Sequence, residues 1–371
     1  MELETNLLPK VSVITACYNT AVYLEKCINS LLQSDYDNKE LIFINDGSTD
    51  ETDKILEKYR SHPEIVIITQ KNQGLSAALN TGIRAATGKY IQVVDSDDWI
   101  SPDLIRKSVE EAERTNADLV YTAHCIAIEE DIDRFHYEEK PIIESRCSSN
   151  REVFETLFKN IVGISDEQIY DWKKKGCLLR ETIPGYNTSR LYRRDLIINN
   201  QIWFDTDVTM KMDCIFNLYY FIYASRTSYI EGPQYFYRIR NDGTNSVAQV
   251  YKNEEHMYKN KLALLKARNK IRQRILKEKH FDIINTYCGS ISLSAIEVAI
   301  CCAKRPQELG YKKYKEYLNS GAWDSISCLK LQFGNFKFNC ILALLKLHCT
   351  KLVYLLMKLA VRLKLDEKLR Q

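Results

Sequence analysis

Residues 11–50, VSVITACYNTAVYLEKCINSLLQSDYDNKELIFINDGSTD, decide the fold class. An apolar run at residues 11–15 predicts a buried strand, and apolar positions at helical spacing predict a helix over residues 22–32. A second apolar run at residues 41–44 predicts another strand, which ends in a turn rich in Asn, Asp and Gly. This strand–helix–strand order is typical of two parallel strands joined by a crossover helix.

The same alternation continues outward to about residue 122. Further strands are predicted at residues 65–69, 90–94 and 119–122, and further helices at residues 48–59, 75–86 and 101–115. Repeated β-α-β order predicts an α/β fold with a Rossmann-like, mainly parallel sheet and helices on both faces. Helical patterns dominate from about residue 254, so we expect a helical C-terminal region after a boundary near residue 250.

Composition narrows the class of protein. The chain has 371 residues, of which 45% are apolar and 27% charged, as in globular proteins of one or two domains. A net charge of +3 does not suggest a nucleic-acid binder. The N-terminal residues do not read as a signal peptide, and the 12 cysteines form no CxxC pair. We therefore expect reduced thiols and a cytoplasmic protein.

Three polar clusters follow three of the predicted strands. Tyr18 and Asn19 follow the first strand, Asp46 the second, and Asp95 and Asp97 the fourth. The carboxyl ends of parallel strands meet at one edge of the sheet, where α/β folds bind ligands. We therefore expect these side chains to line one site.

Each cluster has a chemical interpretation and a plain structural one. Asp95 and Asp97, at i and i+2, can share Mg²⁺ or Mn²⁺ and leave positions for phosphate oxygens, or they can form a solvated turn before a helix. Asp46 can accept hydrogen bonds from a nucleobase or form an Asx-turn. Tyr18 and Asn19 can stack against a base or form a simple turn.

The segments VSVITACYN, LIFINDGSTDET and NQGLSAALNTGIRAATGKYIQVVDSDDW resemble the family-2 glycosyltransferases with a GT-A fold, of the type that builds bacterial surface polysaccharides. The resemblance spans about residues 10–122. It implies a GT-A domain over residues 1–250, with a nucleotide-sugar-binding half at 10–125 and an acceptor-side half at 126–250. Residues 251–371 are then a helical C-terminal region with a basic amphipathic tail.

The resemblance also implies roles for single residues. Tyr18, Asn19, Asp46 and Asp95 would bind a nucleotide sugar, usually a UDP-sugar, and Asp95 and Asp97 would hold Mn²⁺ or Mg²⁺ as a DxD element.

A catalytic base is implied in KMDCIFN, and this nominates Asp213. One base acting opposite the leaving group implies inverting transfer of a hexosyl or N-acetylhexosaminyl group. The acceptor would be a hydroxyl of a saccharide or of a lipid-linked molecule.

Four residues depart from the family pattern. Ala16 replaces a common Pro, Asn45 the first Asp of a DDGS turn, Leu79 a frequent Arg, and Met212 the acid beside Asp213. Met212 and Leu79 leave open a non-catalytic carbohydrate-binding or scaffold protein that retains the fold. A sugar-phosphate nucleotidyltransferase is a second alternative, although the Gly-rich basic loop that such enzymes carry after the first strand is absent.

Several aromatic residues could contact an acceptor, because sugars stack on aromatic faces. The candidates are Trp99, Trp172, Tyr186 and Trp203, and each also suits packing in the core or a loop. Arg238 suits either a contact with the diphosphate or a surface ion pair.

The charge is unevenly distributed along the chain. Residues 330–371 carry a net charge of +7, which leaves −4 on the remainder. Lys351, Lys358 and Arg362 fall near one face of a predicted helix, as in helices that lie in an anionic membrane interface. A helical bundle packed on the body or on a second subunit is the alternative. We expect peripheral contact with the inner face of the cell membrane through residues 335–371, and the sequence allows a homo-oligomer.

Overall fold

The computed structural model describes residues 8–131, 134–139, 146–158, 186–240, 254–278, 284–328 and 336–363. The chain forms two compact units. One comprises the residues up to 153 together with 185–249, and the other comprises residues 154–184 together with 250–371.

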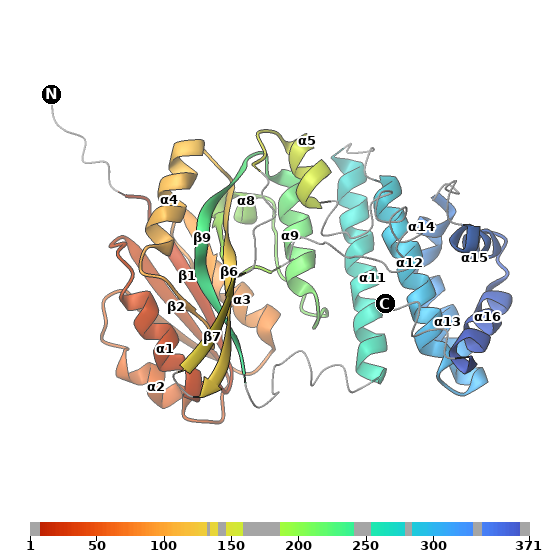
Figure 1. Cartoon of the computed structure of the whole chain (residues 1–371), viewed down its shortest axis with the longest axis horizontal. Coiled ribbons are helices and arrows are strands. Elements are labelled where there is room, and N and C mark those ends of the chain that lie inside the picture. Colours follow the sequence, from red (N-terminus) through yellow and green to blue (C-terminus); the bar gives the residue numbers. More distant parts are fainter. Residues whose placement is uncertain are drawn as a thin grey trace. The chain divides into compact units, whose positions relative to one another are not determined.

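Nine strands of the described residues form one sheet in the first unit (Figure 1). Four of them are parallel neighbours, in the order β3 (Ile65–Gln70), β2 (Lys39–Asp46), β1 (Val11–Cys17) and β4 (Tyr90–Val93). These are strands that the apolar runs predicted. β1, β2 and β4 are buried on both faces and are therefore largely apolar, whereas β3 lies at the edge of the sheet and is only partly buried. The predicted α/β fold is confirmed.

The second half of the sheet has mixed directions. β8 (Arg190–Arg193) lies antiparallel between β4 and β6 (Leu119–Asp131). β6 also pairs with β7 (Arg134–Glu139) and β9 (Thr227–Ile239), and β9 pairs with β5 (Trp99–Ile100). The strand predicted at residues 119–122 is thus much longer, because its extension pairs with β7, which follows it directly, and with β9, about a hundred residues later in the chain.

Helices cover both faces of the sheet. Val11 and Val13 of β1 belong to a core cluster that includes side chains of α1 (Ala21–Leu32) and α4 (Leu104–Thr115). Ile14, which points to the other face, meets α3 (Leu75–Ala85) at Gly82. A Cβ atom on Gly82 would lie 2.3 Å from Cγ2 of Ile14, so only glycine permits this approach of the helix to the sheet.

The remaining helices of the first unit follow the predicted alternation and then extend beyond it. They are α2 (Thr52–Lys58), α5 (Asn150–Val153), α8 (Arg194–Asn199) and α9 (Met212–Tyr223).

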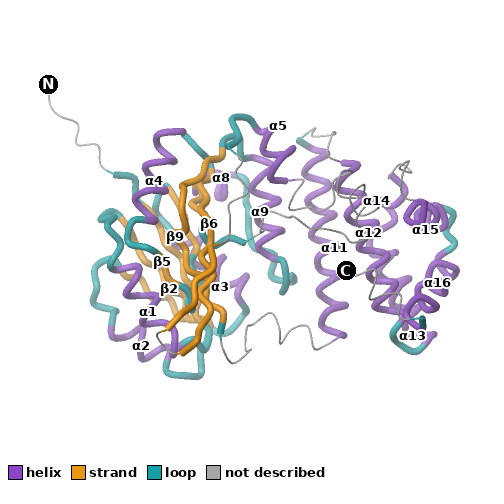
Figure 2. Tube along the Cα trace, viewed as in Figure 1, coloured by secondary structure: helices purple, strands orange, loops and turns teal. Residues whose placement is uncertain are grey.

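The described part of the second unit consists of helices alone (Figure 2). They are a π-helical turn at Phe154–Phe158, α11 (Glu254–Lys277), α12 (Ile284–Ala303), α13 (Gln307–Tyr317), a π-helical turn at Leu318–Ala322, α14 (Trp323–Cys328), α15 (Phe336–Lys346) and α16 (Thr350–Arg362). α12 is central, since α11, α13, α14 and α16 all contact it. Within the described ranges, no helix is both long enough and apolar enough to span a bilayer.

Candidate active site

The loops after β1 and β2 are joined by Asn19. Its backbone has a left-handed φ of 51°. Its side-chain oxygen accepts a hydrogen bond from the Thr49 backbone N–H at 2.8 Å, and its own N–H donates to Oγ of Ser48 at 3.1 Å. The neighbouring Tyr18 is half exposed at the carboxyl end of β1. A base-stacking role for Tyr18 stays a prediction, and Asn19 holds the loop that presents it.

Asp46 ends β2 and is buried. Its carboxylate accepts hydrogen bonds from Nε2 of Gln70 (2.7 Å) and from the backbone N–H groups of Gln73 (3.0 Å) and Gly74 (2.8 Å). A carboxylate offers about four lone-pair positions, so one remains for a ligand donor. The contact of Asp46 with a nucleobase therefore stays a prediction. Asp46 also fixes the loop that begins α3.

The acidic turn after β4 is anchored by Asp98, to which the sequence pattern assigned no role. Its carboxylate accepts hydrogen bonds from the Tyr235 hydroxyl (2.7 Å) and the Arg238 backbone N–H (2.8 Å). The Tyr235 hydroxyl also accepts a hydrogen bond from the Asp95 backbone N–H at 3.1 Å. β9 thus holds the turn in shape, which leaves Asp95 and Asp97 as its partly exposed acids.

Two arginines of the FYRIR segment approach this turn in different ways. Arg238 is buried, pairs with Glu129 at 2.8 Å and donates from Nε to the Asp97 carbonyl at 2.9 Å. Arg240 instead reaches the Asp97 carboxylate, with Nη2 2.5 Å from Oδ2. Arg240 is therefore the arginine that pairs with an acid of the site. Arg238 instead holds the backbone of the acidic turn through the Asp97 carbonyl.

Electrostatics indicate that three carboxylates from two separate segments lie close together. Burial and the charges of Asp97 and Asp213 raise the pKa of Asp95 from 3.8 to about 7. Asp97 lies two residues from Asp95, but Asp213 comes from α9, more than a hundred residues later. The structure thus brings Asp213 close to the predicted metal ligands.

Asp213 lies in the first turn of α9, after Lys211, whose φ is +62°. Burial raises the pKa of Asp213, while hydrogen bonds and the charges of Arg190 and Lys211 oppose this shift. One of its oxygens accepts a hydrogen bond from the Cys214 N–H at 3.0 Å. A partly buried carboxylate with a raised pKa is a suitable proton acceptor near neutral pH.

Two polar residues on the same face of α9 as Asp213 anchor this helix to its neighbours. Asn217 and Tyr220 follow it at i+4 and i+7, the spacing of one helix face. Asn217 accepts a hydrogen bond from the Tyr192 hydroxyl at 2.7 Å and donates to the Asp213 carbonyl at 3.0 Å.

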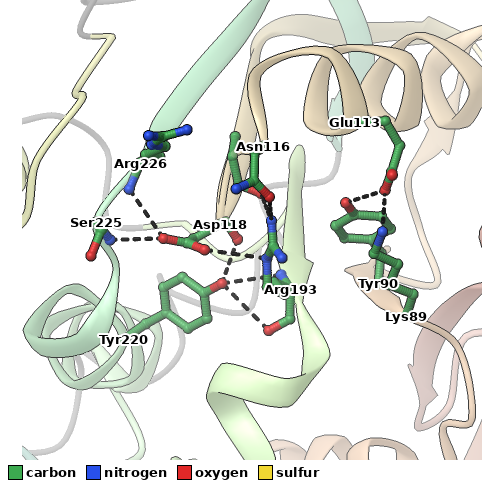
Figure 3. A network of polar contacts seen from close by, with 10 residues as sticks. Lys89, Tyr90, Glu113, Asn116, Asp118, Arg193, Tyr220, Ser225 and Arg226 are labelled. Atoms are coloured by element: carbon green, nitrogen blue, oxygen red, sulfur yellow. Dashed lines mark hydrogen bonds and ion pairs between the residues drawn. The ribbon is translucent and has the colours of Figure 1, made fainter.

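Tyr220 joins the network drawn in Figure 3. Its hydroxyl donates to the Asp118 carbonyl and accepts from the Arg193 N–H, and the Arg193 guanidinium pairs with Asp118 at 3.2 Å. Asp118 also accepts hydrogen bonds from the N–H groups of Ser225 and Arg226. This network ties α9 to β8 and to the starts of β6 and β9.

Tyr186 is the aromatic candidate that the structure places beside the carboxylates. It is half exposed, stacks on Tyr237 with ring centroids 6.4 Å apart, and meets the edge of His124 at 5.1 Å. The charge of Asp213 contributes to the raised pKa of Tyr186, and those of the acidic turn contribute to the pKa of about 12 at Tyr237. The pair therefore extends from Asp213 towards the acidic turn.

The tryptophan candidates lie elsewhere. Trp99 is a core residue that stacks on Phe236 at 5.5 Å, so the core interpretation holds for it. Trp203 is only partly exposed and is covered by the Arg84 guanidinium at 4.8 Å. Trp172 lies outside the described residues.

The donor set fits a hard divalent cation. Asp95 and Asp97 supply carboxylate oxygens that repel each other, and a bound cation would relieve this repulsion. At Asp97, the positive charge of the Arg240 guanidinium already neutralises part of the negative charge. In the part of the chain that is described, no three His, Cys, Asp or Glu side chains form a metal-binding group. A cation here would take its remaining ligands from a diphosphate and water, as Mg²⁺ commonly does.

Two of the departures from the family pattern are core residues. Leu79 and Met212 are both buried, and the Met212 sulfur accepts a hydrogen bond from the Ser76 hydroxyl at 2.9 Å. Their apolar character therefore suits the core, and the contact of Met212 with Ser76 joins α9 to α3.

Comparison with known proteins agrees with this architecture. Residues 12–174 match the model of glycosyl transferase family 2. An uncharacterized glycosyltransferase of Bacillus subtilis, EpsJ, is 33% identical over 257 residues, which are 68% of each chain. Chondroitin synthase of Escherichia coli is 39% identical over 104 residues, which are 28% of this chain and 15% of that protein.

Crystal structures of TarS residues 1–349 from S. aureus share the fold. The TM-score is 0.64 at 16% identity, over 96% of this chain and 92% of that one. Another structure of the same TarS fragment, in complex with UDP-GlcNAc, gives a TM-score of 0.63 at 17% identity, with the same coverage. On the family match and the similarity to EpsJ, the chain belongs to glycosyl transferase family 2, and it is a glycosyltransferase with a GT-A fold.

Proposed function

We propose that this chain transfers a hexosyl or N-acetylhexosaminyl group from a UDP-sugar to a hydroxyl of a saccharide or lipid-linked acceptor, with inversion, in the synthesis of a bacterial surface polysaccharide. The convergence of Asp95, Asp97 and Asp213 carries the proposal. It provides one carboxylate site for the leaving diphosphate and another for the acceptor. The reaction belongs to residues 1–250, with the donor on 10–125 and the acceptor on 126–250.

On the donor side, Tyr18, Asn19, Asp46 and Asp95 bind the nucleotide sugar. A half-exposed aromatic ring at Tyr18 suits stacking on a base, and the remaining acceptor position of Asp46 suits a base N–H. The complex of TarS with UDP-GlcNAc, on the same fold, supports a UDP-sugar as the donor.

Asp95 and Asp97 hold the divalent cation, Mn²⁺ or Mg²⁺. When bound, it would stabilise the charge that develops on the leaving diphosphate. Arg240 pairs with Asp97 before the ligand arrives, so its guanidinium is released for the phosphate oxygens once Asp97 is engaged.

Asp213 takes the proton from the acceptor hydroxyl. Its raised pKa brings it nearer to the working pH, and a positioned base contributes ~10²- to 10⁴-fold to the rate. Attack from the side of Asp213, opposite the diphosphate, gives a single displacement with inversion. Tyr186, stacked on Tyr237, offers an aromatic face to an acceptor sugar beside this base.

We place the enzyme in the cytoplasm, in peripheral contact with the inner face of the cell membrane through residues 335–371, where a lipid-linked acceptor would be found. The basic and apolar sequence of this region supports that location.

The test compares Asp213→Asn with Asp97→Ala. We expect Asp213→Asn to abolish transfer while UDP-sugar binding, measured by thermal shift with Mn²⁺, survives. Asp97→Ala should weaken the Mn²⁺-dependent part of that binding. Asp195→Asn is the matched control, because Asp195 is an exposed acid in the first turn of α8. Full turnover by Asp213→Asn would remove this residue from the mechanism.

A further inference from the structure

α16 presents a continuous leucine face to the solvent. Five leucines at i, i+3, i+4, i+7 and i+11, the spacing of one side of a helix, are between 39 and 59% exposed. They are Leu352, Leu355, Leu356, Leu359 and Leu363, which we call the leucine face. Scattered exposed apolar residues need no explanation, whereas a contiguous patch indicates an interaction site.

The opposite side of α16 fixes its orientation. Val353, Tyr354 and Met357 are buried, and Tyr354 stacks on Tyr314 of α13 at 6.3 Å and donates to the Cys302 carbonyl of α12 at 3.4 Å. The helix therefore has a side committed to the helical unit, and the leucine face is not turned inward by packing.

A basic stripe runs along one edge of the leucine face. Lys351, Lys358 and Arg362 lie between 60 and 120° from its centre, on the side away from Val353, at about 100° per residue. Residues 349–363 contain no acid, so this surface carries a charge of +3. An exposed apolar face with a basic edge matches the two components of an anionic lipid surface, its acyl chains and its headgroups.

We propose that the leucine face docks on an anionic lipid bilayer, with α16 parallel to the surface and Lys351, Lys358 and Arg362 on the headgroups. The inference deepens the proposed peripheral location and rests on that part of the proposed function, not on sugar transfer itself. In a symmetric dimer, the leucine face of a second copy would bring leucines but no acid for the basic stripe, so charge complementarity favours lipid over this pairing.

Flotation of the full-length protein with phosphatidylcholine vesicles, with and without phosphatidylglycerol, tests the proposal. We expect wild type to float with the anionic vesicles. The variant Leu355→Ser/Leu359→Ser should lose at least about tenfold in affinity. Replacing Lys351, Lys358 and Arg362 by Gln should cost about fivefold per residue, on anionic vesicles only.

Two controls keep the result interpretable. Val22→Ser/Val66→Ser removes two exposed apolar residues from the first unit and should float like wild type. Circular dichroism and thermal unfolding establish that each variant is folded, and hydrolysis of UDP-GlcNAc with Mn²⁺ reports on the sugar-transfer site separately.

If the wild-type protein does not float with anionic vesicles, the inference is wrong, even where donor hydrolysis is intact. Equal binding to neutral vesicles overturns the role of the basic stripe. A wild-type dimer that Leu355→Ser/Leu359→Ser converts to a monomer, without vesicle binding, assigns the leucine face to self-association instead. Loss of donor hydrolysis with normal flotation counts against the proposed reaction alone.

Discussion

Replacing Asp95 by Asn should stabilise the nucleotide-free protein while it removes a proposed metal ligand. Burial and the charges of Asp97 and Asp213 raise the pKa of Asp95 from 3.8 to about 7. Keeping this carboxylate ionised therefore costs the native state free energy. An amide of the same shape carries no charge and avoids that cost.

The structure sets the size of the effect. A rise of about 3 pKa units corresponds to ~4 kcal/mol, at 1.36 kcal/mol per unit. Asp97 and Asp213 share the repulsion and water reaches part of Asp95, so we expect a gain of ~1–2 kcal/mol in the free energy of unfolding. In a unit of this size, each kcal/mol raises the melting temperature by ~2–4 °C.

The pH dependence has a definite sign. Since the pKa of Asp95 is raised in the folded state, the native protein binds more protons than the unfolded chain between about pH 4 and pH 7, and wild-type stability falls as pH rises through this window. The advantage of Asp95→Asn should therefore be full near pH ~8 and small near pH ~4.

Thermal unfolding at both pH values, with and without Mn²⁺, is the assay. Mn²⁺ should raise the melting temperature of wild type and leave Asp95→Asn nearly unchanged. Asp207→Asn, at an exposed acid outside the cluster, controls for the change in net charge. An equal gain at both pH values, or no gain at the higher one, would refute the assigned repulsion.

Three further changes test neighbouring parts of the site. Arg240→Ala should tighten Mn²⁺ binding to the nucleotide-free protein about fivefold in calorimetry, because the cation no longer competes with a pair worth ~1 kcal/mol; unchanged affinity would contradict that competition. Asn217→Leu leaves its buried polar partners without a hydrogen bond and should lower the free energy of unfolding in urea by ~2–3 kcal/mol. It should also slow turnover, because Asp213 is displaced. Unaltered stability and rate would show that Asn217 does not position Asp213. Tyr186→Ala should raise the KM for a saccharide acceptor, with donor binding unchanged, while Tyr186→Phe keeps the aromatic face; an effect on donor binding would place this ring elsewhere.

Local patterns predicted the first half of the sheet well. The runs at residues 11–15, 41–44 and 65–69 lie within β1, β2 and β3. β1 and β2 are buried on both faces, which requires apolar side chains there, whereas β3 is a partly exposed edge strand whose Ile and Val residues suit a strand. β8 could not be found in this way. It pairs antiparallel with strands far from it in the chain, and its four residues carry two arginines, so no local signal distinguishes it from a loop.

The same contrast holds for the candidate site. Asp95, Asp97 and Asp213 could be nominated from the motifs in which they lie. The roles of Asp98 and Arg240 depend on contacts between the turn after β4 and β9, which are more than 130 residues apart in sequence. No spacing rule reaches that far.

By itself, the sequence determined the α/β class, the resemblance to the family and the acids of the proposed mechanism, because strand periodicity, motifs and carboxylates are properties of short segments. Only the tertiary structure decided which arginine meets Asp97, which aromatic ring lies beside Asp213, and which side of α16 is covered. The physical reason is that pairing, burial and pKa depend on neighbours brought together by folding, and these neighbours come from distant parts of the chain.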